Sequence, residues 1–451
     1  MRSSRAFVPG LRRKADRLVE ALAPRQLLAA HGNKLAGGIE QGLSSLTSMI
    51  GLSLLSRMMD INAFGIVATA SGIWLMMEMI QHSVTINPFI LSCPHPETDR
   101  EGFGAWVIWN FLLALATAGL FMIGGMLLHP HLPAFAEGLF LSGPLCLAAM
   151  IYMFLRRLQY HQANRLTLLC QTMLYSAVYL VALIILSYRS EHPTPVEGAA
   201  VLTVAYAIPA IVMSFTTLRG ARFNWSFTAH VWKARKLVTE LGAAGIIWQV
   251  PYTITLLALS IFSSPAAVAI FTVTRTLVRP ITLVMATIGD VEYSRASRTF
   301  AANGIVGLAG IVRHVRNSLW LLNALPIALL LCFPGFFLSL IYGQQYADAT
   351  LDLQLRVLMF VPLIYLTPMD MSLAIVRDTR YVLIIYTLSL VACLVYLVGA
   401  YCLGVLDATA ALASLVFARL VPIPFFQRRY WQKILEPCRT APGLAGEARH
   451  A

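Results

Sequence analysis

Twelve apolar stretches follow one another along this chain of 451 residues, and each is long enough for a helix to cross a bilayer. A spanning helix takes roughly 20 residues, because in lipid every backbone N–H and C=O has to be bonded within the protein. No long polar insert separates the stretches. We therefore predict an all-α integral membrane protein, with spans at 33–56, 63–86, 104–127, 134–155, 166–187, 197–218, 238–262, 265–289, 317–341, 350–375, 381–404 and 407–427.

Composition excludes a soluble protein of the same length. Residues of the AVILMFWYC types make up 58% of the chain, and charged residues make up 12%. In soluble proteins these shares are roughly 45–50%, with glycine included, and about 25%. The seven cysteines are scattered without a C-x-x-C pair, so we expect neither a disulfide framework nor a metal site.

Lysine and arginine predict the orientation, because they are enriched in cytoplasmic loops. Seven precede the first span, five lie in loop 219–236 and four lie in loop 290–316. The facing loops 128–133 and 342–349 carry none. Both termini are therefore expected in the cytoplasm. This bias accounts for most of the net charge of +13, so no nucleic-acid partner is needed to explain it.

Six spans precede the most basic loop and six follow it, so the halves can be parallel repeats about an axis normal to the membrane. We expect two halves of six helices each. The N-terminal basic segment either forms an interfacial helix or is a mobile tail. The predicted divisions are a basic cytoplasmic segment (1–32), the first lobe (33–218), a basic cytoplasmic linker (219–237), the second lobe (238–427) and a cytoplasmic tail (428–451).

The eighth span carries two arginines, Arg275 and Arg279, in a stretch otherwise suited to hydrocarbon. A central arginine costs about 2.5–3.5 kcal/mol on insertion scales, so it needs a partner or water. Thr272 and Thr282 extend the same helical face, and Pro280 bends the helix because it lacks a backbone donor. This pattern favours the wall of a water-filled cavity. The alternative is snorkelling to the cytoplasmic edge, which lies closer to Arg279 than to Arg275.

Three more ionisable side chains lie early in the chain: Glu40 on the first span, and Glu78 with His82 on the second. Counted from the cytoplasmic ends, both glutamates lie about 11–12 Å deep, near the depth of Arg279. They either pair with the arginines or exchange protons during a transport cycle. The spacing of Glu78 and His82 also fits a local helix contact.

Further polar residues lie within the second half. Arg419 lies in the middle of the twelfth span, and Asp352 and Arg356 are expected to form a structural ion pair. Arginines in one cavity favour an anion, since guanidinium groups bind phosphate with paired donors. The candidate substrate-binding residues are Gln249, Thr272, Arg275, Arg279 and Arg419.

The sequence lacks the common motifs of nucleotide-binding and catalytic sites. No Walker motif, H-E-x-x-H or nucleophile elbow appears where it would be needed. We therefore expect a transporter without enzymatic activity, cofactor or ATP-driven step within this chain. A coupling ion, if transport uses one, would be a proton or sodium.

Four segments in this order resemble the bacterial polysaccharide flippases, the O-antigen and exopolysaccharide family of a superfamily that also holds multidrug extruders and lipid II flippases. They are GIEQGLSSLTSMIGLSLLSRMMDINAFGIVATAS (38–71), FLRRLQYHQANR (154–165), PAAVAIFTVTRTLVRP (265–280) and LIYGQQYADAT (340–350). The resemblance covers nearly all of 33–427. It implies two six-helix lobes around a central cavity that faces each side of the bacterial inner membrane in turn.

The resemblance also implies a cargo, undecaprenyl-pyrophosphate-linked oligosaccharide, moved from the inner to the outer leaflet for lipopolysaccharide or exopolysaccharide biosynthesis. A polysaccharide polymerase and glycosyltransferases would be its partners. The essential arginine on the eighth helix of lipid II flippases corresponds to Arg275 or Arg279. The chain departs from that branch in two ways. It lacks two extra helices, and its first two spans hold glutamates instead of arginines, apart from Arg57.

Two other functions stay open. An ion-coupled multidrug extruder of the same superfamily would fit Glu40 and Glu78 but not the arginines of the eighth span. A membrane polysaccharide polymerase or ligase would need a sizeable outer loop with acid–base residues, and the longest outer loop, 188–196, has only nine residues.

The span map predicts that reporter fusions at His192 and Gln345 are exported, because both positions lie in loops poor in lysine and arginine. Alkaline phosphatase should be active at both positions and inactive when fused within 219–236. Cytoplasmic reporter activity at both His192 and Gln345 would overturn the span map.

Overall fold

The computed structural model describes residues 39–93, 99–161, 165–218 and 231–440. All the regular elements within these ranges are helices, so the all-α prediction is confirmed. The predicted cytoplasmic segment 1–32, most of the linker 219–237 and the end of the tail lie outside the described residues. The division of the chain at these boundaries stays a prediction.

The first lobe begins with a helix at residues 39–58. Short polar side chains then mark helix starts: Asp60 and Asp99 each accept a backbone N–H, and Thr194 forms a capping box with Glu197. The lobe continues with α2 (Ile61–Gln81), the π-helical η1 (His82–Ile86), α3 (Asn87–Ser92), α4 (Arg100–Leu128), α5 (Pro133–His161), α6 (Arg165–Arg189) and α7 (Pro195–Thr217).

Several helices of the second lobe begin with a proline in the first turn, where the missing backbone N–H costs no hydrogen bond. Its elements are α9 (Arg235–Phe262), α10 (Pro265–Leu277), α11 (Arg279–Cys332), α12 (Pro334–Tyr342), η3 (Gln344–Tyr346), α13 (Thr350–Leu358), α14 (Phe360–Ile375), α15 (Thr379–Cys402), α16 (Ala408–Leu420), α17 (Ile423–Tyr430), η4 (Trp431–Leu435) and α18 (Glu436–Thr440).

Within the described ranges, nine helices are long and apolar enough to cross a membrane, and a bent pair adds a tenth span. All twelve predicted spans overlap helices. The helix 39–58 is not among the nine, because Glu40, Gln41 and several serines make it polar. The part of α9 whose side chains are described without a gap, Val250–Phe262, is a shorter apolar helix. The chain is therefore a multi-pass membrane protein.

Two predicted boundaries need correction. The eighth span is not one helix, because α10 and α11 meet at Val278 with a bend of 48°. The bend expected at Pro280 is thereby confirmed, and it falls just before the proline because the ring crowds the preceding turn. The predicted loop 290–316 is helical and belongs to α11. This long helix turns at Gly304, where φ is 63°, a conformation that glycine adopts without strain.

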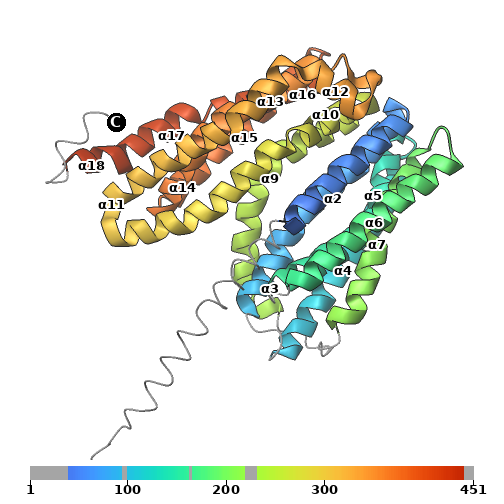
Figure 1. Ribbon diagram of the computed structural model, residues 1–451, viewed down its shortest axis with the longest axis horizontal. Coiled ribbons are helices and arrows are strands. Elements are labelled where there is room, and N and C mark those ends of the chain that lie inside the picture. Colours follow the sequence, from blue (N-terminus) through green and yellow to red (C-terminus); the bar gives the residue numbers. More distant parts are fainter. Residues whose placement is uncertain (1–38, 94–98, 162–164, 219–230, 441–451) are drawn as a thin grey trace, which may run out of the picture.

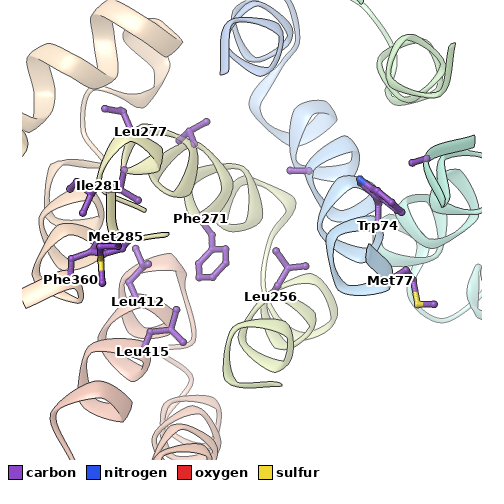
Figure 2. Close-up of a cluster of buried hydrophobic side chains, with 14 of the residues drawn as sticks. Trp74, Met77, Leu256, Phe271, Leu277, Ile281, Met285, Phe360, Leu412 and Leu415 are labelled. Carbon is purple, nitrogen blue, oxygen red and sulfur yellow. The ribbon is translucent and has the colours of Figure 1, made fainter. Parts of the chain in front are cut away.

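The lobes pack against each other along α2, which contacts both α9 and α10. A Cβ atom on Gly65 would lie 1.9 Å from the carbonyl oxygen of Pro265. A Cβ on Gly72 would lie 2.3 Å from Leu256, which Figure 2 shows directed from α9 toward the helix that carries Trp74. Glycines on α2 therefore permit the close approach of helices that is typical of membrane interfaces.

At one end the lobes are joined by a reciprocal pair of helix caps, the outer clasp, formed by Arg57 and Gln345. Arg57 ends the helix 39–58 and donates to the carbonyls of residues 339–341 at the end of α12, with Nε 2.9 Å from its acceptor. Gln345 donates to the carbonyls of Ser56 and Met59. The last carbonyls of a helix have no partner within it, so each lobe completes a helix of the other.

Figure 1 shows the two lobes converging at the end where α2, α10 and α12 lie. The outer clasp lies at this end. Toward the ends of α4 and the first half of α11, the lobes spread apart in the view. With the predicted orientation, the converging end faces the outside of the membrane.

Removing the Arg57 side chain should loosen this end, since three hydrogen bonds between the lobes are lost while the freed carbonyls can bind water. We expect Arg57→Ala to lengthen the distance between spin labels at Leu132 and Leu403, measured by pulsed electron paramagnetic resonance. Arg189→Ala, which removes the same charge from the end of α6, is the matched control. Unchanged distances in Arg57→Ala would contradict the clasp.

Candidate functional site

A cavity of about 400 Å³ lies between the lobes and is lined by both. The helix 39–58, α2, α5, α6 and α7 contribute from the first lobe, and α9 to α11, α13, α14 and α16 contribute from the second. The two sides differ in chemistry. The second lobe supplies all the cations among the lining residues, and the first lobe supplies aromatic, leucine and serine side chains.

The cationic side, the arginine wall, consists of Arg275, Arg279, Arg356 and Arg419. Thr272 and Thr282 line the cavity beside them, as the shared helical face predicted. The structure thus brings four of the five candidate substrate-binding residues together. The fifth, Gln249, lies on α9, and its side chain is outside the described part. Among the described residues, no Asp or Glu lines this cavity.

Arg356 is held mainly by aromatic rings. Its Cζ lies 4.2 Å from the centre of the Phe271 ring and 5.6 Å from that of Tyr252. One Nη donates to the Phe271 carbonyl at 3.1 Å, while the buried Nε has no hydrogen-bond partner. Arg275 lies over the same Tyr252 ring at 4.6 Å. Two guanidinium groups therefore share one ring, and such contacts are worth only about 0.5–2 kcal/mol each.

The ion pair expected between Asp352 and Arg356 is wrong. In the described structure the Asp352 carboxylate accepts a hydrogen bond from Thr409 at 2.8 Å and forms no ion pair with Arg356. A spacing of four places two side chains on one helical face, but packing decides where each one points. Arg356 points toward α9 and α10 and joins the arginine wall.

Arg279 connects the two lobes. Its Nη1 donates to the hydroxyl of Ser48 on the helix 39–58. Arg419, at the other edge of the wall, lies close enough to Asp370 and Tyr386 to interact with them electrostatically. Glu78 interacts in the same way with Arg279, and Asp352 with Arg356. No described carboxylate forms an ion pair with Arg275, Arg279 or Arg356.

A second cavity of about 330 Å³ adjoins the first at the ends predicted to be cytoplasmic. Trp74, Tyr206 and Arg279 are among the residues that line both cavities. Glu78 lines the second cavity together with Arg157, so one predicted glutamate does lie close to the cations. The two cavities thus share lining residues, and the second extends toward the ends predicted to be cytoplasmic.

Glu40 lies outside both cavities and is fully buried. Arg156 donates to it from Nε at 2.9 Å and from Nη2 at 2.7 Å. Thr172 donates at 2.7 Å, and Tyr160 donates as well. Glu40 is thus the counter-charge of Arg156 on α5, and its contacts include neither arginine of the eighth span.

His82 lies in the π-helical turn η1 and lines neither cavity. Its backbone N–H donates to the Glu78 carbonyl, as expected one turn along a helix. Among the described residues, no hydrogen bond or ion pair joins the two side chains, so the local contact suggested by their spacing is one of the backbone. The three early ionisable residues have separate surroundings, and only Glu78 faces a cavity.

The first-lobe side of the larger cavity, the aromatic wall, consists of Trp74, Tyr175, Tyr179 and Tyr206. Sequence analysis missed it. The signal was the stripe Thr172, Tyr175, Ser176 and Tyr179, which recurs at spacings of three, one and three and places polar and aromatic side chains on one face of α6.

No protein-family model matches the chain, and no curated protein matches it in sequence. Solved structures do match. The lipid II flippase MurJ in an inward closed conformation aligns with a TM-score of 0.68 at 12% identity, over 87% of this chain and 86% of that chain. An inward-facing multidrug resistance MATE transporter of the MOP superfamily gives 0.64 at 12% identity, over 88% and 96%.

The chain therefore shares its fold with these transporters. An outward-facing MATE transporter of this superfamily aligns with a TM-score of only 0.52, at 14% identity over 89% of this chain and 97% of that chain. The inward-facing MATE transporter thus aligns with the higher TM-score.

The contacts of Glu40 predict a large effect on stability. Glu40→Gln leaves the buried Arg156 charge without its counter-charge, which typically destabilises by about 3–5 kcal/mol. Glu292→Gln is the control, because the Glu292–Arg295 pair is partly exposed and should be worth about 1 kcal/mol or less. Thermal unfolding of purified protein in detergent is the measurement.

The double variant Glu40→Leu, Arg156→Met removes both charges and should recover most of the lost stability. If Glu40→Gln unfolds at the temperature of the unmodified protein, the counter-charge role is wrong.

Proposed function

We propose that the chain is a flippase of the MOP superfamily that moves undecaprenyl-pyrophosphate-linked oligosaccharide from the inner to the outer leaflet, for polysaccharide biosynthesis or export. The arginine wall carries this proposal: four arginines and no described carboxylate line a cavity between two lobes in the membrane. The similarity to MurJ, whose name describes it as a lipid II flippase, supports a lipid-linked cargo.

A diphosphate suits this wall for a simple electrostatic reason. Moving a phosphate out of water is costly unless strong donors replace its hydration. Guanidinium groups present planar pairs of N–H donors that match phosphate oxygens, and each arginine has about five such donors. The unpartnered Nε of Arg356 and the threonines beside Arg275 add to the set. An anionic head group would neutralise charges that the second lobe leaves unpaired.

The arrangement also provides for movement of the head group. The Ser48 hydroxyl accepts a hydrogen bond from Arg279 across the two lobes, and a bound anion can take over this link. The second cavity opens a polar path from the predicted cytoplasmic ends, along which the head group would enter. Release to the outside would require the lobes to part at the clasp formed by Arg57 and Gln345. Glu78 beside Arg279 is the residue placed to exchange a proton or bind sodium, if an ion drives this step.

An ion-coupled extruder of organic cations is the alternative, because MATE transporters share the fold. A cation would have to bind beside Arg275, Arg279 and Arg356, and no described carboxylate lines the larger cavity. Cation binding is therefore expected at most near Glu78. A polysaccharide polymerase and glycosyltransferases are proposed as partners only because they would act on the same cargo.

The proposal predicts how binding of farnesyl diphosphate, a short-chain probe, depends on Arg275. Arg275→Ala should weaken binding at least about tenfold, since a charged hydrogen bond contributes about 1.5–3 kcal/mol. Arg275→Lys should be intermediate, because lysine keeps the charge and loses the planar donor pair. The measurement is the dissociation constant of the purified protein in nanodiscs.

Arg295→Ala is the matched control, because it removes one arginine from a site outside both cavities. Farnesol, which lacks the charge, should bind much more weakly than the diphosphate. Equal affinity of the Arg275→Ala variant and the unmodified protein for farnesyl diphosphate would contradict the proposal. So would tighter binding of tetraphenylphosphonium, an organic cation, than of the diphosphate.

A further inference from the structure

We propose that the aromatic wall is a carbohydrate subsite, which takes the sugar ring nearest to the diphosphate while the arginine wall holds the phosphates. The inference rests on the proposed function and assigns the opposite side of the same cavity. It follows from three features of the first lobe: the packing of its aromatic rings, the unpaired hydroxyl of Tyr179 and the position of the rings relative to Arg279.

The rings of the aromatic wall support one another. Tyr206 is the most exposed of them, and it packs on Tyr175 with ring centres 5.2 Å apart and on Trp74 at 6.0 Å. Tyr175 also packs on Tyr179 at 6.0 Å. Trp74 and Tyr175 are 3% exposed, and they fix the orientation of Tyr206 from behind. A ring held in this way offers its face at little entropic cost.

Tyr179 adds an unsatisfied polar group. Its side chain is 1% exposed and lines the cavity, and its hydroxyl has no hydrogen-bond partner. The ring fits only because Gly51 of the helix 39–58 lacks a side chain, since a Cβ there would lie 2.1 Å from Tyr179 Cε1. A buried hydroxyl without a partner loses about 1–3 kcal/mol, so a ligand that bonds to it would regain that energy.

A sugar ring matches this combination better than an alkyl chain does. A pyranose presents a face of C–H groups, which the negative face of an aromatic ring attracts, and a rim of hydroxyl groups. A prenyl tail would use only the ring face and would leave the Tyr179 hydroxyl unpaired. The cavity, at about 400 Å³, is also near the small end of the range for ligand sites, so it suits a head group more than a long tail.

The position of Arg279 orders the two parts of the head group. Arg279 belongs to the arginine wall but reaches Ser48 on the first lobe, so it lies at the seam between the walls. Trp74, Tyr206 and Arg279 line both cavities. A diphosphate on the arginines therefore places its first sugar against Tyr206, and further sugars would extend into the second cavity, past Glu78 and Arg157.

The test compares two probes on the purified full chain in nanodiscs: farnesyl diphosphate, and farnesyl diphosphate joined to one sugar. A panel of glucose, galactose and N-acetylglucosamine covers the choice of sugar. At least one sugar-bearing probe should bind about fivefold more tightly than the bare diphosphate. Tyr206→Leu should abolish this gain and leave binding of the bare diphosphate unchanged.

Tyr206→Phe keeps the ring and should keep most of the gain, and Tyr179→Phe, which removes one hydroxyl, should reduce it. Tyr396→Leu, on a ring outside both cavities, is the matched control. The subsite is wrong if no sugar improves binding, or if Tyr206→Leu weakens both probes equally, as a tail-binding wall would. These results differ from the one that would contradict the proposed function, which is that Arg275→Ala leaves the affinity for the bare diphosphate unchanged.

Discussion

Arginine side chains inside the membrane are the constraint on which the rest of this structure depends. A guanidinium group stays charged at any physiological pH, so it has to be hydrated, paired or placed against polarisable groups. The protein uses different solutions in its two lobes. Arg156 is paired with Glu40. Arg275 and Arg356 are placed against the Tyr252 ring and left facing a cavity.

The difference between the lobes gives the cavity its polarity. No described carboxylate lines the larger cavity, and two nearby ones have other hydrogen-bond partners, Arg156 for Glu40 and Thr409 for Asp352. The charge of the arginine wall can be stabilised by water or by an anionic ligand in the cavity. An ion pair with a fixed carboxylate would neutralise it and would weaken the binding of an anion. The aromatic wall opposite adds no competing charge, so the cavity discriminates by sign first and by shape second.

The connections between the lobes are weak in the places where transport would require movement. The clasp of Arg57 and Gln345 uses hydrogen bonds to exposed helix ends, which water can replace. Arg279 holds Ser48 through one side-chain contact. By contrast, Gly65 sits against the backbone of Pro265 with no space for a side chain. The tight glycine contact is suited to act as a pivot, and the hydrogen bonds are suited to break.

Sequence patterns predicted the helices and the convergence of Arg275, Arg279 and Arg419, because a charge in an apolar stretch needs a polar surrounding. They could not predict the direction of Arg356, since its neighbour at a spacing of four looked like a partner. They also could not predict the partner of Glu40. Arg156 is 116 residues away in the sequence and lies just beyond the predicted span 134–155. Pairing across such distances depends on tertiary packing, which periodicity within one helix does not describe.

The most direct measurement is an experimental structure of the protein bound to farnesyl diphosphate. The account predicts that the two phosphates lie in the larger cavity, within hydrogen-bond distance of at least two of Arg275, Arg279 and Arg356. It also predicts that the link between Arg279 and Ser48 is broken or shared with the ligand. A diphosphate bound elsewhere, with these arginines unchanged and the cavity free of ligand, would contradict the account.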